Sequence, residues 1–143
     1  MENSRSKIIM VDDNITNLTV AKNLLADTYN FFTVPSGKKL FQILEKLTPD
    51  LILLDIEMPE MNGFETIEML KSKENFSSIP VIFLTADNSS EKKEKGLSLG
   101  AVDYITKPFT KELLVKRMEV HLSVNKQKGE LNNSSQNTEK SGL

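Results

Sequence analysis

The stretch LILLDIEMPEMNG, residues 51–63, places an acid, Asp55, directly after four aliphatic residues. A second acid, Glu57, follows two positions later, and the chain then turns through a Met-Pro pair and an Asn-Gly pair. An unbroken aliphatic run of this length is typical of a parallel β-strand that is covered on both faces. The stretch therefore predicts a buried strand that ends in a carboxylate at the mouth of the core.

Four other segments have the character of strands. Residues 8–11 and 81–84 are apolar runs like residues 51–54, and residues 31–34 and 102–105 are weaker candidates. Apolar and polar residues do not alternate within these apolar runs, so we expect a sheet with both faces covered.

Helical patterns lie between these strand candidates. Apolar residues recur at helical spacing in five sets: Ile15, Leu18, Ala21, Leu24 and Leu25; Leu40, Leu44 and Leu47; Phe64, Ile67 and Leu70; Leu97 and Leu99; and Leu114, Met118 and Leu122. Asn14 is a predicted N-cap for the first helix, and Thr48-Pro49 is the expected end of the second. The fourth candidate, residues 89–99, is mostly charged and contains Gly96, which costs about 1 kcal/mol relative to alanine. Its charged run at residues 91–95 is interpreted as a solvated helix face. We expect this helix to be the easiest part of the fold to move.

Strand and helix alternate five times along the chain. This order predicts an α/β protein, a doubly wound (βα)5 fold with a five-stranded parallel sheet between two layers of helices. The 143 residues suit one domain. We expect an N-terminal extension at residues 1–6, the domain at residues 7–124, and a polar, flexible tail or linker at residues 125–143.

The composition excludes several classes of protein. The net charge is −2, which argues against direct nucleic-acid binding, and the absence of cysteine argues against disulfides and thiolate metal sites. The single histidine, His121, falls on the last helical pattern, where we expect a surface or half-buried residue and no zinc site. No apolar run approaches the roughly 20 residues of a membrane span, and the start does not resemble a signal peptide, so a cytoplasmic location is predicted.

Polar side chains follow three of the predicted strands. Asp12, Asp13, Asp55 and Thr85 all fall at carboxyl ends of strands, where parallel sheets bind ligands. Three carboxylates at one edge repel one another unless a cation joins them, and oxygen ligands of this kind favour Mg²⁺. Lys107 follows the last strand and can bring a fixed positive charge to the same edge. A phosphoryl group would need such a charge together with a hydroxyl donor.

Four motifs, VDD at 11–13, LILLDIEMPEMNGFE at 51–65, VIFLTA at 81–86 and DYITKPF at 103–109, resemble the receiver domain of two-component response regulators. The resemblance extends over residues 7–124. It implies a flavodoxin-like fold with strand order 2-1-3-4-5.

The resemblance implies that Asp55 is the phosphoacceptor, with a sensor histidine kinase or a histidine phosphotransfer protein as donor. Asp12 and Asp13 resemble the acidic pair that holds Mg²⁺, Asp13 directly and Asp12 largely through water. Asp55 and the backbone carbonyl of Glu57 would complete the metal site, and Mn²⁺ is an alternative ion.

The remaining roles also follow from the resemblance. Thr85 and Lys107 resemble the pair that grips the phosphoryl oxygens, and Tyr104 resembles the aromatic switch that turns inward when Thr85 moves. Lys107-Pro108 is the expected cis peptide bond. The candidate modulating positions are Glu57, Ala86 and Asp87. The Glu57 carboxylate would point near the phosphoryl group, where it would either order the attacking water or repel the phosphate.

We therefore expect a phosphorylation-controlled signalling module, not an enzyme with an external substrate. Its output face would comprise the helix at 89–99, the strand at 102–105 and the last helix. A homodimer through this face stays open, because Asp103 and Arg117 resemble residues that pair across a dimer in one receiver subgroup. An output domain could be fused or separate.

Two other classes of function are compatible with some of these residues. Haloacid-dehalogenase-type phosphatases also combine an aspartate at a strand end, an acid two residues later, a threonine and a lysine. Their nucleophile follows the first strand and their acidic pair follows the lysine, whereas here the pair precedes Asp55. An interaction-only receiver that is never phosphorylated is disfavoured, because all the required side chains are present.

Overall fold

The strand predicted at residues 51–54 is β3, Leu51–Asp55, and all five of its residues are buried. The computed structural model describes residues 5–87 and 89–124, so the predicted tail at 125–143 and most of the predicted N-terminal extension lie outside the described residues. The other strands are β1 (Lys7–Val11), β2 (Asn30–Val34), β4 (Val81–Thr85) and β5 (Asp103–Thr106). The two weaker candidates are thus confirmed: β2 begins one residue earlier than expected, and β5 is shifted by one residue at both ends.

The five strands form one parallel sheet in the order β2-β1-β3-β4-β5, which confirms the expected topology. In this register, Val11 pairs with Leu54, and Asp55 pairs with Leu84. The carboxyl ends of β1, β3 and β4 are therefore neighbours at one edge of the sheet.

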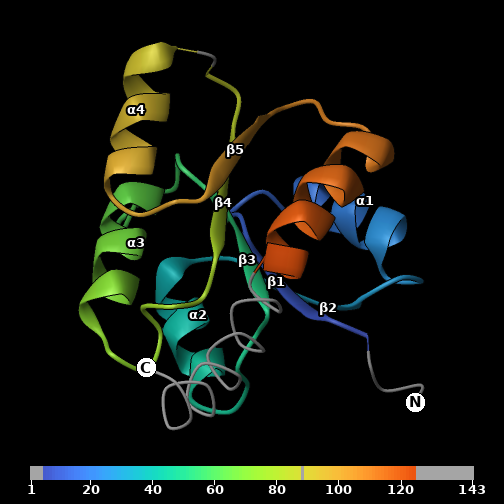
Figure 1. The fold of residues 1–143 in the computed structure, drawn as a ribbon, viewed down its shortest axis with the longest axis horizontal. Helices are drawn as coiled ribbons and strands as arrows, with labels where there is room; N and C mark the ends of the chain where they lie inside the picture. The colour runs from blue at the N-terminus through green and yellow to red at the C-terminus, as the bar shows by residue number, and fades with distance from the viewer. Residues whose placement is uncertain (1–4, 88, 125–143) are drawn as a thin grey trace, which may run out of the picture.

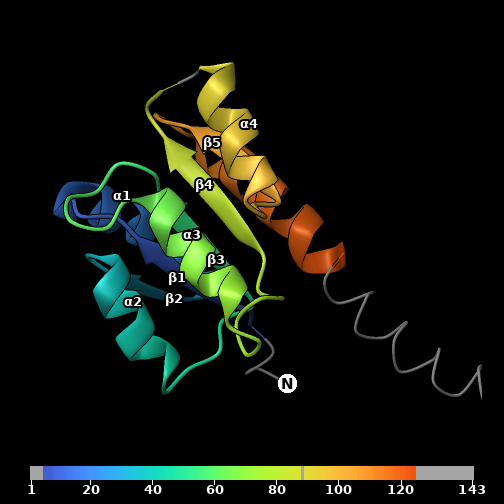
Figure 2. The same ribbon diagram turned by 90° about the vertical axis from the view of Figure 1, so that its left-hand side faces the viewer.

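Helices cover both faces of the sheet (Figure 1). They are α1 (Ile15–Leu25), α2 (Gly37–Leu44), α3 (Gly63–Ser72) and α4 (Ser90–Ser98), and residues 111–124 are also helical. Figure 2 shows α2, α3 and α4 in front of the sheet, with α1 and the last helix behind it. Two buried apolar clusters, one on each face, fill the space between these layers.

The start of each labelled helix is fixed by a side-chain cap. Asn14, Ser36, Asn62 and Ser89 each accept a hydrogen bond from a backbone N–H in the first turn of the helix that follows. Asn62 forms a full capping box with Glu65, whose carboxylate accepts the Asn62 backbone N–H at 2.9 Å. The N-cap prediction for Asn14 is confirmed.

Three helix predictions differ from the structure. Ile15 was expected in the buried stripe but is 73% exposed at the first position of α1. The second helix ends at Leu44, before the expected stop at Thr48-Pro49. Leu97 was expected to anchor the fourth helix but is 45% exposed. The only buried residue of α4 is Gly96.

Gly96 explains how a nearly apolar-free helix packs on the sheet. A Cβ at this position would lie 2.8 Å from Cδ2 of Phe83, a residue that is 1% exposed in the middle of β4. Phe83 itself packs edge-on against Phe64, with ring centroids 5.5 Å apart. The glycine therefore permits close approach between α4 and β4, a packing role that adds to its expected cost in helix propensity.

Replacing Gly96 with alanine is expected to destabilise the protein. Helix propensity alone would stabilise it by about 1 kcal/mol, but overpacking of a buried site typically costs about 1–3 kcal/mol, and the Phe83 ring has little room to yield. We expect a net loss of about 1 kcal/mol in the free energy of unfolding, measured by urea denaturation. Ser98→Ala, at an exposed position on the same helix, is the control. A gain in stability from Gly96→Ala would contradict this account.

Among the residues that the structure describes, no helix combines the length and the apolar character needed to cross a membrane.

Candidate functional site

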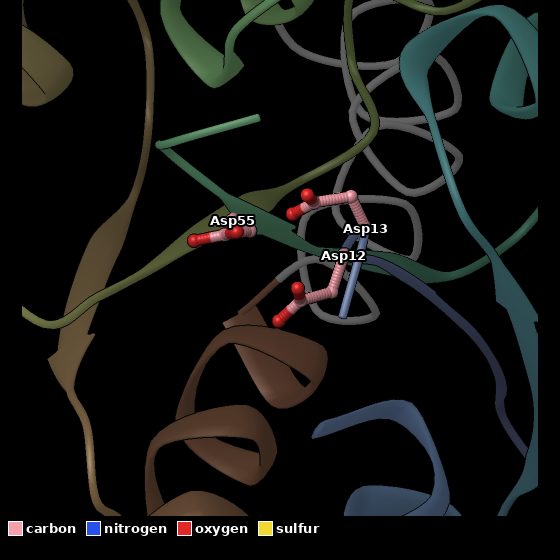
Figure 3. A group of neighbouring side chains, drawn as sticks. All are labelled: Asp12, Asp13 and Asp55. Atoms are coloured by element: carbon pink, nitrogen blue, oxygen red, sulfur yellow. The ribbon is translucent and has the colours of Figure 1, made fainter. Parts of the chain in front are cut away.

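Three carboxylates meet at the carboxyl edge of the sheet (Figure 3). Asp12 and Asp13 directly follow β1, and Asp55 is the last residue of β3. Each offers one oxygen that lies within 4.8 Å of the oxygens offered by the other two. The structure therefore brings together the three acids that the sequence placed at strand ends, at a spacing at which one cation can join them.

The sharp return of the chain after β3 depends on Gly63. The backbone N–H of Gly63 donates to the Ile56 carbonyl oxygen at 2.7 Å and closes the loop between β3 and α3. A Cβ at Gly63 would lie 2.5 Å from the backbone oxygen of Asp55, so a side chain cannot be accommodated without displacing the backbone. The glycine thus allows α3 to begin directly against the Asp55 end of the strand.

Asp12 is fully buried, and both of its oxygens are already bonded. Oδ1 accepts the Asn14 backbone N–H at 2.9 Å, and Oδ2 accepts from Asn17 Nδ2 and Lys107 Nζ, both at 3.1 Å. Asp13 is exposed. Asp13 is therefore the more accessible of the two carboxylates, whereas both oxygens of Asp12 already have partners within the protein.

Lys107 connects the two buried acids. Its Nζ lies 3.2 Å from Oδ1 of Asp55 and 3.1 Å from Oδ2 of Asp12, and its backbone N–H donates to the Thr85 carbonyl oxygen at 2.7 Å. Burial disfavours the ammonium, but attraction from Asp55 and Asp12 outweighs burial and raises the pKa of Lys107. The Lys107-Pro108 peptide bond is cis, as expected.

Asp55 is held in an environment that disfavours its charged form. Burial, and then repulsion by Asp12, raise the pKa of Asp55 from 3.8 to about 6, against the opposing effects of Lys107 and of the Glu57 backbone N–H. One lysine therefore does not fully compensate the two buried carboxylates. A divalent cation at this edge would favour the ionised form of Asp55.

Thr85 lies at the same edge, at the end of β4, and is 2% exposed. Its hydroxyl accepts the Asp87 backbone N–H at 2.9 Å and donates to the Asp87 carbonyl oxygen at 3.2 Å. The hydroxyl is thus bonded to its own loop and not to Asp55. Ala86, which lies between Thr85 and Asp87 in the sequence, is exposed.

The Glu57 side chain pairs with α4. It is exposed, and its Oε2 lies 2.6 Å from Nζ of Lys92 on α4. The same ammonium lies 3.3 Å from Oδ2 of Asp87. Sequence reasoning missed Lys92, because it belongs to a charged run that was interpreted as a solvated helix face. The only available signal would have been that acids at two strand ends face the start of α4.

Tyr104 is half-buried against the apolar cluster that lies under α2, α3 and α4, and Nζ of Lys93 lies 4.5 Å from its ring centroid. Asp103 pairs within the chain. Its Oδ1 lies 2.7 Å from Arg117 Nη1, and its Oδ2 lies 3.1 Å from His121 Nε2. The pair considered for a dimer interface is therefore intramolecular here. His121 is half-buried, as expected.

Hollows in the described part of the chain border α2, α3 and α4. One, of about 630 Å³, lies between α2 and α3 and is lined by apolar residues that include Phe41, Met61 and Phe76, but by none of the three carboxylates. Another, of about 530 Å³, borders the site and is lined by residues that include Glu57 and Lys92. We take the carboxylate edge as the functional site, because the first hollow contains none of the chemistry described above.

The model of the response regulator receiver domain matches residues 8–119. A protein named probable cyclic di-GMP phosphodiesterase from Vibrio cholerae is 42% identical over 119 residues, which are 83% of this chain and 27% of that protein. The curated relatives are mostly much longer, and the chain spans between 7% and 54% of their lengths.

Solved structures show the same likeness. Chemotaxis protein CheY4 of Vibrio cholerae is 31% identical with a TM-score of 0.77, over 81% of this chain and 98% of that one. The receiver domain of a sensor histidine kinase from Pseudomonas aeruginosa is 28% identical with a TM-score of 0.77, over 84% of this chain and 99% of that one. Its structure has a magnesium ion coordinated in the active site cleft.

Proposed function

This chain belongs to the response regulator receiver domain family, and on that premise we propose that it accepts a phosphoryl group on Asp55. The observation that carries the proposal is the contact of Lys107 Nζ with Asp55, at 3.2 Å, beside two further carboxylates. A lysine at that position can compensate negative charge on the Asp55 side chain before and after transfer.

In the proposed reaction, a carboxylate oxygen of Asp55 attacks the phosphorus of a phosphohistidine. The new P–O bond forms as the P–N bond breaks, and the neutral imidazole of the donor leaves with a proton from solvent. Lys107 remains beside the acyl phosphate. Thr85 can donate its hydroxyl to a phosphoryl oxygen once it gives up its hydrogen bond to the Asp87 carbonyl.

The donor set at the edge fits Mg²⁺, because it consists of hard oxygen ligands and leaves room for water and phosphate. Asp13, Asp55 and the backbone carbonyl of Glu57 would hold the ion, and Asp12 would act largely through water. The bound ion would supply positive charge that lowers the pKa of Asp55 and offsets the phosphoryl oxygens. Mn²⁺, which also accepts oxygen ligands, is proposed as a substitute ion.

The proposed output is a rearrangement of the face made by α4, β5 and the last helix. Phosphorylation adds a charge of about −1.5 to −2, by analogy with phosphorylated hydroxyls. Movement of Thr85 toward that charge would release its loop, and Tyr104 would turn inward. Because Asp103 is already paired within the chain, any homodimer through this face would rest on other contacts.

We propose that the partners are a sensor histidine kinase or a histidine phosphotransfer protein as donor, and an output domain that is fused or separate. Support comes from the family and from its relatives, since the chain matches only part of longer proteins.

Incubation with acetyl phosphate and Mg²⁺, followed by mass spectrometry of the intact protein, tests the proposal. We expect the mass to increase by one phosphoryl group, and we expect EDTA to prevent the increase. A generic phosphomonoester should not be turned over. No mass increase would favour an interaction-only receiver, and turnover of the phosphomonoester would favour a phosphatase.

A further inference from the structure

A charged bridge crosses the mouth of the site. Lys92 Nζ lies 2.6 Å from Oε2 of Glu57 and 3.3 Å from Oδ2 of Asp87. Glu57 belongs to the loop after β3 and Asp87 to the loop after β4, whereas Lys92 lies in the first turn of α4. One ammonium therefore joins the two loops that directly follow Asp55 and Thr85.

The bridge is continued by hydrogen bonds inside the β4–α4 loop. Oδ1 of Asp87 accepts the Ser89 backbone N–H at 2.9 Å, so the two oxygens of Asp87 bind different partners. Ser89 in turn caps α4 by accepting the Lys92 backbone N–H at 3.4 Å. These contacts fix the direction in which the lysine leaves the helix, and they place its ammonium over Glu57.

Glu57 has an alternative position available to it. It follows Asp55 by two residues, and its side chain lines the hollow of about 530 Å³ at the border of the site. Phe64 and Lys95 form other parts of that lining, so the hollow lies between α3 and α4. A Glu57 side chain that is released from Lys92 would therefore have open space beside it.

We propose that Lys92 is a positioning residue that holds the Glu57 carboxylate away from the phosphoryl group and thereby lengthens the lifetime of phosphorylated Asp55. This inference rests on the proposed function. Glu57 acts on the attacking water, and Lys92 acts only through Glu57.

Loss of the phosphoryl group is a hydrolysis. A water oxygen attacks phosphorus, the P–O bond to Asp55 breaks, the Asp55 carboxylate leaves, and the water protons end on inorganic phosphate and solvent. A free Glu57 carboxylate would accept a hydrogen bond from that water and orient it. In the structure, Oε2 of Glu57 is bonded to Lys92 instead. Exposed ion pairs contribute little to stability, so the effect is expected in the rate of hydrolysis and not in folding.

The test uses Lys92→Met in the full chain, phosphorylated with acetyl phosphate and freed of donor before the decay is followed by mass spectrometry. We expect decay about 3–10-fold faster than in wild type, below the roughly 10²–10⁴-fold of ideal acid–base catalysis. In a Glu57→Gln background, the same substitution should change the rate less than about twofold, since the group that Lys92 positions is absent. Lys92→Arg should retain the wild-type lifetime.

Lys116→Met is the matched control. Lys116 is exposed on the last helix and does not line the hollow beside Glu57, so the variant removes the same charge without releasing Glu57. An unchanged or slower decay in Lys92→Met, or equal acceleration in both backgrounds, would overturn the proposal. If wild type itself takes up no phosphoryl group, the proposed function fails, and that outcome is distinct from any change in lifetime.

Discussion

Asp55→Asn is expected to reduce phosphorylation by acetyl phosphate to below about 1% of wild type, because an amide is not a competent nucleophile. The substitution keeps the shape of the side chain, so loss of phosphorylation would report the chemistry and not a change of fold. The intact mass after incubation with donor and Mg²⁺ measures the effect. Asp50→Asn, just before the opposite end of β3, is the control and should be phosphorylated like wild type.

The same substitution is expected to stabilise the protein at neutral pH in the absence of Mg²⁺. Burial and repulsion by Asp12 raise the pKa of Asp55 to about 6, whereas the carboxyl of an unfolded chain titrates near 3.8. The folded state therefore binds more protons than the unfolded state between these values, and stability falls as the pH rises through this range. Above about pH 6 the full penalty is present, and we estimate it at about 1–2 kcal/mol after allowing for water at the site.

Thermal melts of both proteins from pH 3.5 to pH 8 measure this effect. The stability difference between Asp55→Asn and wild type should be small at the acid end, grow between about pH 4 and pH 6, and stay constant above that range. Added Mg²⁺ should reduce the difference, because it binds the ionised site of the wild type. A difference that does not change with pH would mean that Asp55 is ionised with an ordinary pKa in the folded protein.

The positions of the acids could be predicted from the sequence, because they depend on a rule of topology. Aliphatic runs that end in Asp12 and Asp55 specify parallel strands, and the carboxyl ends of neighbouring parallel strands meet at one edge. Lys107 required more, since it contacts Asp55 across 52 positions of sequence. Its place at the site was predicted because it follows the fifth strand and because the motif DYITKPF resembles that of receiver domains.

The sequence was less informative about α4. Its charged residues carry no apolar periodicity, so the interpretation as a solvated face was reasonable for most of them. Two residues of this helix, one of them uncharged, depend on contacts with distant parts of the chain. Gly96 is fixed by the Phe83 ring of β4, and Lys92 is fixed by acids in two loops. Local patterns do not contain such information, because each contact joins elements that the chain places side by side only after folding.

The Asp103 and Arg117 pair also shows that the sequence does not specify which distant residues come into contact. Opposite charges at these positions are compatible with a contact between chains or within one chain. The structure places Arg117 on the helix that packs behind β5, where it reaches Asp103 at 2.7 Å. The pairing within one chain results from the short distance between the start of β5 and the last helix, which the residue types alone do not reveal.

Asp13→Asn is expected to weaken Mg²⁺ binding by about 10–100-fold. Substitution of residues that only support the metal ligands usually costs this much, so loss of a direct ligand should cost at least as much. Asp13 is the exposed member of the three carboxylates, whereas both oxygens of Asp12 are already bonded within the protein. Removing its charge therefore removes the carboxylate that is most available for direct coordination. Titration with Mg²⁺, followed by calorimetry or by NMR shifts of residues at the edge, measures the affinity.

Asp27→Asn is the matched control, because it removes the same charge from an exposed position beyond the C-terminal end of α1, at the opposite edge of the sheet. Its Mg²⁺ affinity should stay within about twofold of wild type, since charges farther away than roughly 10 Å are largely screened at ordinary ionic strength. Equal losses in both variants would mean that the protein attracts Mg²⁺ through its overall charge. A loss confined to Asp13→Asn would mean that the ion is bound at the edge where β1 and β3 end, next to the carboxylate that is proposed to receive the phosphoryl group.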